Sequence, residues 1–269
     1  MKDVILWELK QRRKTILWWT IGSVVLTGVI LALFPSIRDK ATEMNQVINQ
    51  LPAELRGLKT GGASQVDVGN PAQFLNSQLF YATLPILWII LAITRGASII
   101  GREEQSHALE LLLSRPLARG KLLAAKAVAL MLEYAIVTGV TAIFIVFACP
   151  LFDLSIKTAS VVLAAVYTSL FSLSYGYIAF ALQATSALTK RAAVTIAVAL
   201  GFGGYILASL SSLTDWLKYP VKFVPYHYFD PLKILNGSHA PRGLLVYLIA
   251  TFVLGTIIAY IGFRRRDIE

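Results

Sequence analysis

Few side chains in this sequence have the type and spacing that chemistry on a substrate requires. The three histidines, His107, His227 and His239, lie in connecting segments and have no neighbours at the spacing of metal ligands. The single cysteine, Cys149, cannot form an intrachain disulfide, although a bridge to a second copy stays open. We therefore expect neither a hydrolase nor a redox protein, and we predict no catalytic and no metal-binding residue.

Nucleotide binding by this chain is not expected either. A phosphate-binding loop needs the pattern G-x-x-x-x-G-K-[ST], whose backbone amides and lysine hold the phosphates. The nearest approach, Gly96 to Gly101, continues with Arg102 and Glu103 at the end of an apolar run. The sequence therefore predicts no cofactor bound by this chain.

Two charged residues lie inside apolar runs, where a charge needs a partner or a function. Glu133 is the only acidic residue well inside such a run, and Arg95 lies near the end of the preceding one. At about 1.5 Å per helical residue, both lie roughly 10 Å below the surface of the hydrocarbon. We interpret them as an intramembrane charge pair between adjacent helices. Two alternatives stay open: Glu133 faces a translocation cavity, or it carries protons.

Residues 101–121, GREEQSHALELLLSRPLARGK, combine charged residues with a run of leucines. Glu103 and Glu104 suit the first turn of a helix, and Pro116 predicts that this helix ends near Ser114 or Arg115. The leucines must be buried against the membrane domain or against another protein. The charged residues left for the exposed side are Arg102, Glu103, Glu104, Glu110, Arg115 and Arg119.

Six apolar runs position these residues. In 269 residues, 56% are hydrophobic and the mean hydropathy is +0.65, more apolar surface than one soluble core can hide. The runs reach the length of about 20 residues that crosses a bilayer, and they lack the alternation of barrel strands. We predict one all-α, polytopic transmembrane domain over residues 1–269. Its six spans are expected near residues 16–34, 79–100, 122–148, 159–184, 193–213 and 244–263.

The distribution of basic residues predicts that both termini lie in the cytoplasm. Segments on the side of the termini hold 14 Lys and Arg in 50 positions, against nine in 84 on the opposite side. Cytoplasmic segments carry such an excess, so we expect a multi-pass protein of the cytoplasmic membrane with residues 101–121 inside. A cleaved signal peptide is disfavoured, because the first run lacks a small-residue cleavage site. The basic residues are split among short loops, so no nucleic-acid partner is expected.

Three segments outside the spans have distinct compositions. Residues 1–15 mix apolar and charged positions, which favours a short interfacial helix over a polar tail. Residues 35–78 are expected to form an outer loop with a helical stretch interrupted by Pro52. Residues 214–243 are rich in aromatic residues and prolines, and we interpret them as an outer re-entrant segment, with a simple aromatic belt as the alternative.

Small residues recur at every fourth position in two of the predicted helices. Such faces let helix backbones approach closely in membranes, so we interpret them as packing surfaces and not as ligand contacts. They comprise Ser160, Ala164, Thr168, Ser172 and Gly176 in the fourth span and Thr251, Gly255 and Ala259 in the sixth.

Glu104, the string from Leu109 to Pro116, Arg119 and Lys126 follow one another in a recognisable order. In order and spacing they resemble the signature of bacterial ABC exporter permeases, the ABC-2 type membrane components. This chain differs in having His-Ala where that family commonly has Gly-Thr, and Leu-Ala after the proline where it commonly has Val-Ser or Val-Thr. The resemblance extends along the chain, from the N-terminal helix through six spans to the aromatic outer segment.

The resemblance implies a half-transporter that exports a substrate across the cytoplasmic membrane. It would pair with a second, identical permease and with two copies of an ABC ATPase subunit, which would bind ATP and Mg. The charged residues of 101–121 would then form a coupling helix in a groove of the ATPase. Apolar spans with few internal charges favour an amphiphilic substrate, such as a lipid, a hydrophobic drug or a small peptide. The alternative is a secondary transporter or channel without an ATPase, which would need several polar groups at the midplane.

Overall fold

The computed structural model of the chain describes residues 2–52, 67–105, 119–185, 189–211, 217, 219–237 and 241–264. At residues 3, 100–105 and 119 the description covers the backbone alone. Within these ranges every regular element is a helix, so the predicted all-α class is confirmed.

Six helices are long and apolar enough to cross a membrane, as the sequence predicted. Five of them begin and end within five residues of the predicted spans, whereas the first begins much earlier. The six helices are α1 (Lys2–Ala32), α6 (Thr83–Gln105), α8 (Arg119–Leu151), α9 (Thr158–Ala184), α10 (Lys190–Leu210) and α12 (Arg242–Arg264).

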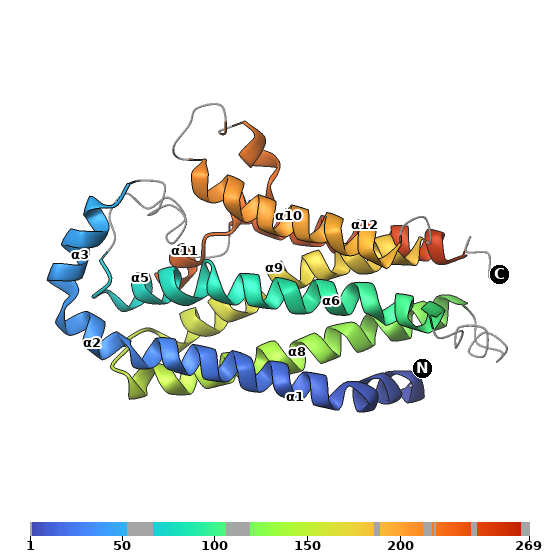
Figure 1. Cartoon of the computed structure of the whole chain (residues 1–269), viewed down its shortest axis with the longest axis horizontal. Helices are drawn as coiled ribbons and strands as arrows, with labels where there is room; N and C mark the ends of the chain where they lie inside the picture. Colours follow the sequence, from blue (N-terminus) through green and yellow to red (C-terminus); the bar gives the residue numbers. More distant parts are fainter. Residues whose placement is uncertain are drawn as a thin grey trace.

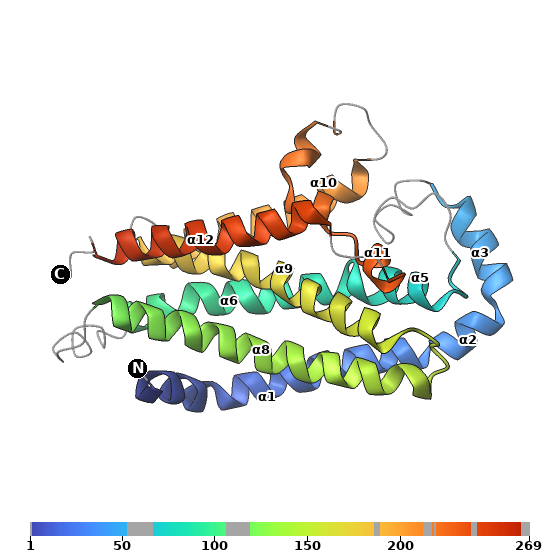
Figure 2. The ribbon, with the colours of Figure 1, turned by 180° about the vertical axis from the view of Figure 1, so that it is seen from behind.

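The long helices lie roughly side by side along the long axis of the molecule (Figure 1). The first residues of α1 and the last residues of α12 lie at the same end of the bundle, which we name the inner end (Figures 1 and 2). The C-terminal end of α6 and the N-terminal end of α8 lie there too, so the connection between these helices belongs to the inner end. We name the opposite end the outer end.

The first helix differs from the prediction of a separate interfacial helix over residues 1–15. From Lys2 onward, these residues form the first turns of α1, which continues for 31 residues without a boundary at residue 15. No proline or glycine precedes Gly22, so nothing in the sequence ends the helix earlier. At about 1.5 Å per residue, α1 is about 46 Å long, and it exceeds hydrocarbon about 30 Å thick. Its first turns therefore extend beyond the hydrocarbon or lie at its edge.

The first outer segment folds into short helices, α2 (Phe34–Asp39), α3 (Ala41–Gln50), α5 (Pro71–Leu75) and the π-helix η1 (Asn76–Phe80). The predicted helical stretch thus ends at Gln50, before Pro52, while residues 53–66 lie outside the described ranges. Asn45 fixes α3 to the start of the next described segment. Its Nδ2 donates to Asp67 Oδ1 at 2.8 Å, and its Oδ1 accepts from the Val68 amide at 2.9 Å.

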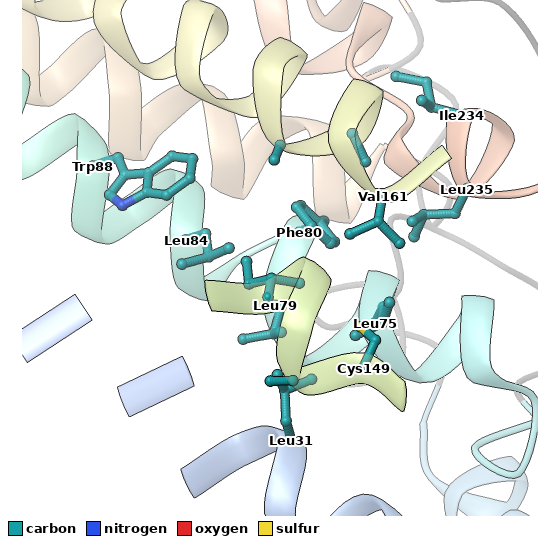
Figure 3. Packing of buried hydrophobic residues seen from close by; sticks show 14 of the residues in the cluster. Leu31, Leu75, Leu79, Phe80, Leu84, Trp88, Cys149, Val161, Ile234 and Leu235 are labelled. Carbon is teal, nitrogen blue, oxygen red and sulfur yellow. The ribbon is translucent and has the colours of Figure 1, made fainter. Parts of the chain in front are cut away.

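The outer segments are packed onto the bundle by one hydrophobic cluster (Figure 3). Side chains from α1, α5, η1, α6, α8 and α9 meet there with side chains of α11 (Pro231–Leu235). Cys149 is 4% exposed within this cluster, so its thiol is not presented to a second copy of the chain. The labelled members of the cluster are Leu31, Leu75, Leu79, Phe80, Leu84, Trp88, Cys149, Val161, Ile234 and Leu235.

The described residues 219–237 of the aromatic outer segment contain three short helices, and each of them begins at a proline. They are η3 (Pro220–Phe223), η4 (Pro225–Tyr228) and α11. Tyr226 and Phe229 are buried against Phe171 of α9, and the Phe171 and Phe229 rings stack with centroids 4.3 Å apart. Tyr219 and Phe223 point outward and are largely exposed. The segment is thus partly packed into the bundle and partly free to contact its surroundings.

The small-residue face of the fourth span is a packing surface, as predicted. All five of its small residues are buried, and Gly176 lies against Ala92 and Gly96 of α6. A Cβ atom added at Gly176 would lie 2.5 Å from the backbone of Ala92, so the two helices touch through their main chains. In the sixth span, Gly255 packs in the same way against the ring of Tyr177.

Candidate functional site

The predicted coupling residues fall partly outside the described structure. The backbone of Arg102, Glu103 and Glu104 is helical at the end of α6, and that of Arg119 is helical at the start of α8. Glu110 and Arg115 lie outside the described residues, and the side chains of all six are not described. What the structure does describe is the pair of helices that flank this segment.

Arg95 and Glu133, predicted as an intramembrane charge pair, are brought together by α6 and α8. The Arg95 Nη2 atom donates to Glu133 Oε2 at 2.6 Å, and both side chains are less than 10% exposed. The two helices run in opposite directions and are joined by one short connection, which places residues of equal depth opposite each other. The Arg95 Nη1 atom also donates to Ser98 Oγ at 3.4 Å.

This ion pair is not fully satisfied by its described surroundings. Arg95 Nε and Glu133 Oε1 are buried without a hydrogen-bond partner among the described residues. In a low-dielectric interior, the attraction between the two charges offsets their desolvation only while both are present. The pair therefore makes the relative position of α6 and α8 sensitive to the loss of either charge.

A second buried ion pair, which was not predicted from the sequence, lies closer to the inner end. Lys126 of α8 is 1% exposed, and its Nζ atom donates to Glu8 Oε1 of α1 at 3.1 Å. The same Nζ donates to the backbone carbonyl oxygen of Ile99 on α6 at 3.0 Å. Lys126 thus joins three helices at one point.

One sequence signal pointed toward this second pair. Lys126 lies seven residues before Glu133, which is two helical turns on the same face of α8, and Ile99 lies one turn beyond Arg95 on α6. The lysine therefore had to face the same neighbour as Glu133. Glu8 could not be paired with it from spacing, because it is 118 residues away and was assigned to a separate surface helix.

Polar side chains in the spans hold helices together within the described part of the chain. The Tyr134 hydroxyl donates to the Ser169 carbonyl at 3.0 Å, and Ser169 Oγ donates to Thr138 Oγ1 at 3.0 Å, which links α8 to α9. The Tyr177 and Thr256 hydroxyls lie 2.8 Å apart and link α9 to α12. These groups make interhelical contacts.

The arrangement is that of a membrane bundle whose described buried ion pairs lie toward its inner end. Among the described residues, no group of three or more histidine, cysteine or acidic side chains could hold a metal ion. The buried charged groups Glu8, Arg95, Lys126 and Glu133 make contacts between helices.

Comparison with known proteins agrees with this arrangement. A family model described as ABC-2 family transporter protein matches residues 3–268, nearly the whole chain. No curated protein matches it. The match and the six apolar helices show a multi-pass membrane component of an ABC transporter, a protein class that associates with an ABC ATPase. The chain belongs to the ABC-2 family of transporter proteins.

Proposed function

We propose that the chain is the permease subunit of an ATP-driven exporter, and that residues 101–121 couple it to a separate ATPase. The observation that carries this proposal is the position of that segment. Its two ends, the C-terminal end of α6 and the N-terminal end of α8, lie at the inner end, where two buried ion pairs hold these helices to each other and to α1. A force applied to the segment would therefore act on three spans together.

The charge of the inner end supports a cytoplasmic location for this end and for both termini. Among the residues whose side chains are described, the one carboxylate at this end, Glu8, is buried on Lys126. The exposed charged side chains described there are all basic, as expected for the cytoplasmic side of the membrane. They are Lys2, Lys10, Arg13, Lys14, Lys121, Arg191 and Arg264.

In this proposal the ATPase binds ATP and Mg, and the permease supplies the docking segment. Arg102, Glu103, Glu104, Glu110, Arg115 and Arg119 would contact a groove of the ATPase. Two ATPase copies would serve two permeases, which we propose are identical. The exposed apolar side chains of α1, α10 and α12 would contact lipid or a second permease.

We propose an amphiphilic substrate, a lipid, a hydrophobic drug or a small peptide. Both buried ion pairs are neutralised inside the bundle, and the outward faces of the spans are apolar. A strongly ionic substrate would lose its hydration with few charged groups of the protein to offset the loss. An apolar chain has no such desolvation cost.

Reversing the acidic charges of the coupling segment should uncouple the complex. For Glu103→Lys, Glu104→Lys and Glu110→Lys, we expect the stimulation of ATP hydrolysis by the permease to fall at least about tenfold, because like charges at an interface repel. Membrane insertion should be unchanged. The measurement is ATPase activity of the reconstituted complex over a panel of lipids, peptides and drugs.

The matched control is Glu43→Lys, which reverses an exposed carboxylate on α3 at the outer end. This variant should keep normal stimulation. Normal stimulation in all three inner variants would contradict the proposed role of the segment.

A further inference from the structure

We infer that Glu8, Lys126 and the Ile99 carbonyl form an inner latch, through which the first turns of α1 move together with the α6–α8 hairpin. Glu8 and Lys126 would thus be positioning residues for energy coupling, acting through α1 and not on ATP or substrate. This inference rests on the proposed function, since it concerns the path by which movement of residues 101–121 enters the bundle.

The latch is held at two points by one ammonium group. Lys126 Nζ lies 3.1 Å from Glu8 Oε1 and 3.0 Å from the Ile99 oxygen. The three residues come from α1, α8 and α6, so α1 is tied to both helices that flank the coupling segment. The Arg95–Glu133 pair, by contrast, joins α6 to α8 within the hairpin, and its hydrogen bonds among the described residues do not reach α1.

Because this ion pair is buried, it resists separation of α1 from the hairpin. Both side chains are almost fully buried, so separating α1 from the hairpin would leave opposite charges unpaired in an apolar environment. Breaking the ion pair therefore costs more free energy than moving α1 together with the hairpin. We thus expect α1 to follow a small movement of the hairpin. Val4 and Ile5 add apolar packing against the same part of the bundle.

Because α1 is continuous, a movement of its first turns would be transmitted to the outer end of the bundle. The helix runs without a break from Lys2 to Ala32, and Leu31 packs in the hydrophobic cluster of the outer end (Figure 3). A displacement at Glu8 would therefore reach the outer cluster through one rigid helix. A separate interfacial helix over residues 1–15 could not transmit it in this way.

The test compares two reporter cysteines in the complex with its co-purified ATPase. The single native cysteine is removed as Cys149→Ala, and Leu6→Cys on α1 or Lys121→Cys on α8 is introduced; both positions are exposed. The rate of labelling by a water-soluble maleimide is measured without nucleotide and after trapping with ATP and vanadate. We expect trapping to change the rate at both positions at least about fivefold, the size of an ordinary coupling between sites.

The latch is then removed as Glu8→Met/Lys126→Met, which replaces both charges of this ion pair together by apolar side chains, an exchange that buried ion pairs often tolerate. In this variant the response at position 121 should persist, and the response at position 6 should fall below about twofold. Lys126→Arg, which keeps the cation, should preserve both responses. Arg38→Gln, which removes an exposed outer ion pair, should also preserve both.

The outcomes separate the two proposals. A full response at position 6 in the double variant, or no response there in the native background while position 121 responds, would overturn the latch alone. No response at either position, or no co-purified ATPase, would overturn the proposed function and the latch with it.

Discussion

Replacing Gly176 by leucine should separate α6 from α9 and destabilise the bundle by about 3 kcal/mol or more. The Cβ atom of any residue at this position would lie 2.5 Å from the carbonyl carbon and oxygen of Ala92. These are backbone atoms, which cannot rotate away as a side chain can, so one helix must move. Unfolding of the purified protein in mixed micelles by a denaturing detergent would measure the loss of stability.

The matched control is Gly139→Leu on α8, where an added Cβ atom meets nothing within 4 Å. Both variants place the same side chain in a membrane helix, and they differ in the contact that it makes. We expect the control to change stability by less than about 0.5 kcal/mol. Equal stability of the two variants would mean that α6 and α9 do not cross at Gly176.

Removing the Glu133 charge should destabilise the bundle by a comparable amount. Glu133→Leu leaves the Arg95 guanidinium buried without its carboxylate, and loss of one partner of a buried pair costs about 3–5 kcal/mol. Arg95→Leu should cost a similar amount for the same reason. The same detergent unfolding experiment measures both variants.

The double variant Arg95→Leu/Glu133→Leu distinguishes a structural pair from a transport residue. With neither charge present, no desolvated ion remains, and we expect at least half of the lost stability to return. ATP hydrolysis stimulated by the permease should then recover as well. A Glu133→Leu variant of native stability that is inactive would instead show that Glu133 faces a translocation cavity or carries protons.

The six spans could be predicted because each depends on local composition alone. A helix of about 20 apolar residues satisfies its own backbone in lipid, whatever its neighbours are. The small-residue face of α9 was also predictable, since its period of four is visible in the sequence. The partner of that face on α6, Ala92 and Gly96, was not identified, because a single stripe does not say which helix it meets.

Whether an ion pair could be predicted depended on whether its two helices follow each other in the sequence. Arg95 and Glu133 lie on consecutive helices at similar depth, so a short connection was enough to bring them together. Glu8 and Lys126 lie on the first and third spans, and chain order does not make those helices neighbours. The boundary placed at residue 15 added to the difficulty, because it moved Glu8 to the membrane surface. The continuous helix α1 carries Glu8 into the bundle instead.

The two buried ion pairs also make different connections at the inner end. Arg95 and Glu133 fix the two helices of the hairpin to each other, and Lys126 fixes the hairpin to α1. Movement of the connecting segment would thus be shared first within the hairpin and then with α1. Substitutions in the two pairs should therefore have different effects on labelling at position 6.

The most direct test of the central claim is purification of the tagged chain from native membranes in a mild detergent. We predict that a protein with a phosphate-binding loop co-purifies with the chain, and that the complex hydrolyses ATP in the presence of Mg. This association should be weakened by Glu103→Lys, Glu104→Lys or Glu110→Lys and retained in Glu43→Lys. A purified chain that moves substrate across vesicle membranes with no nucleotide-hydrolysing partner would contradict the account.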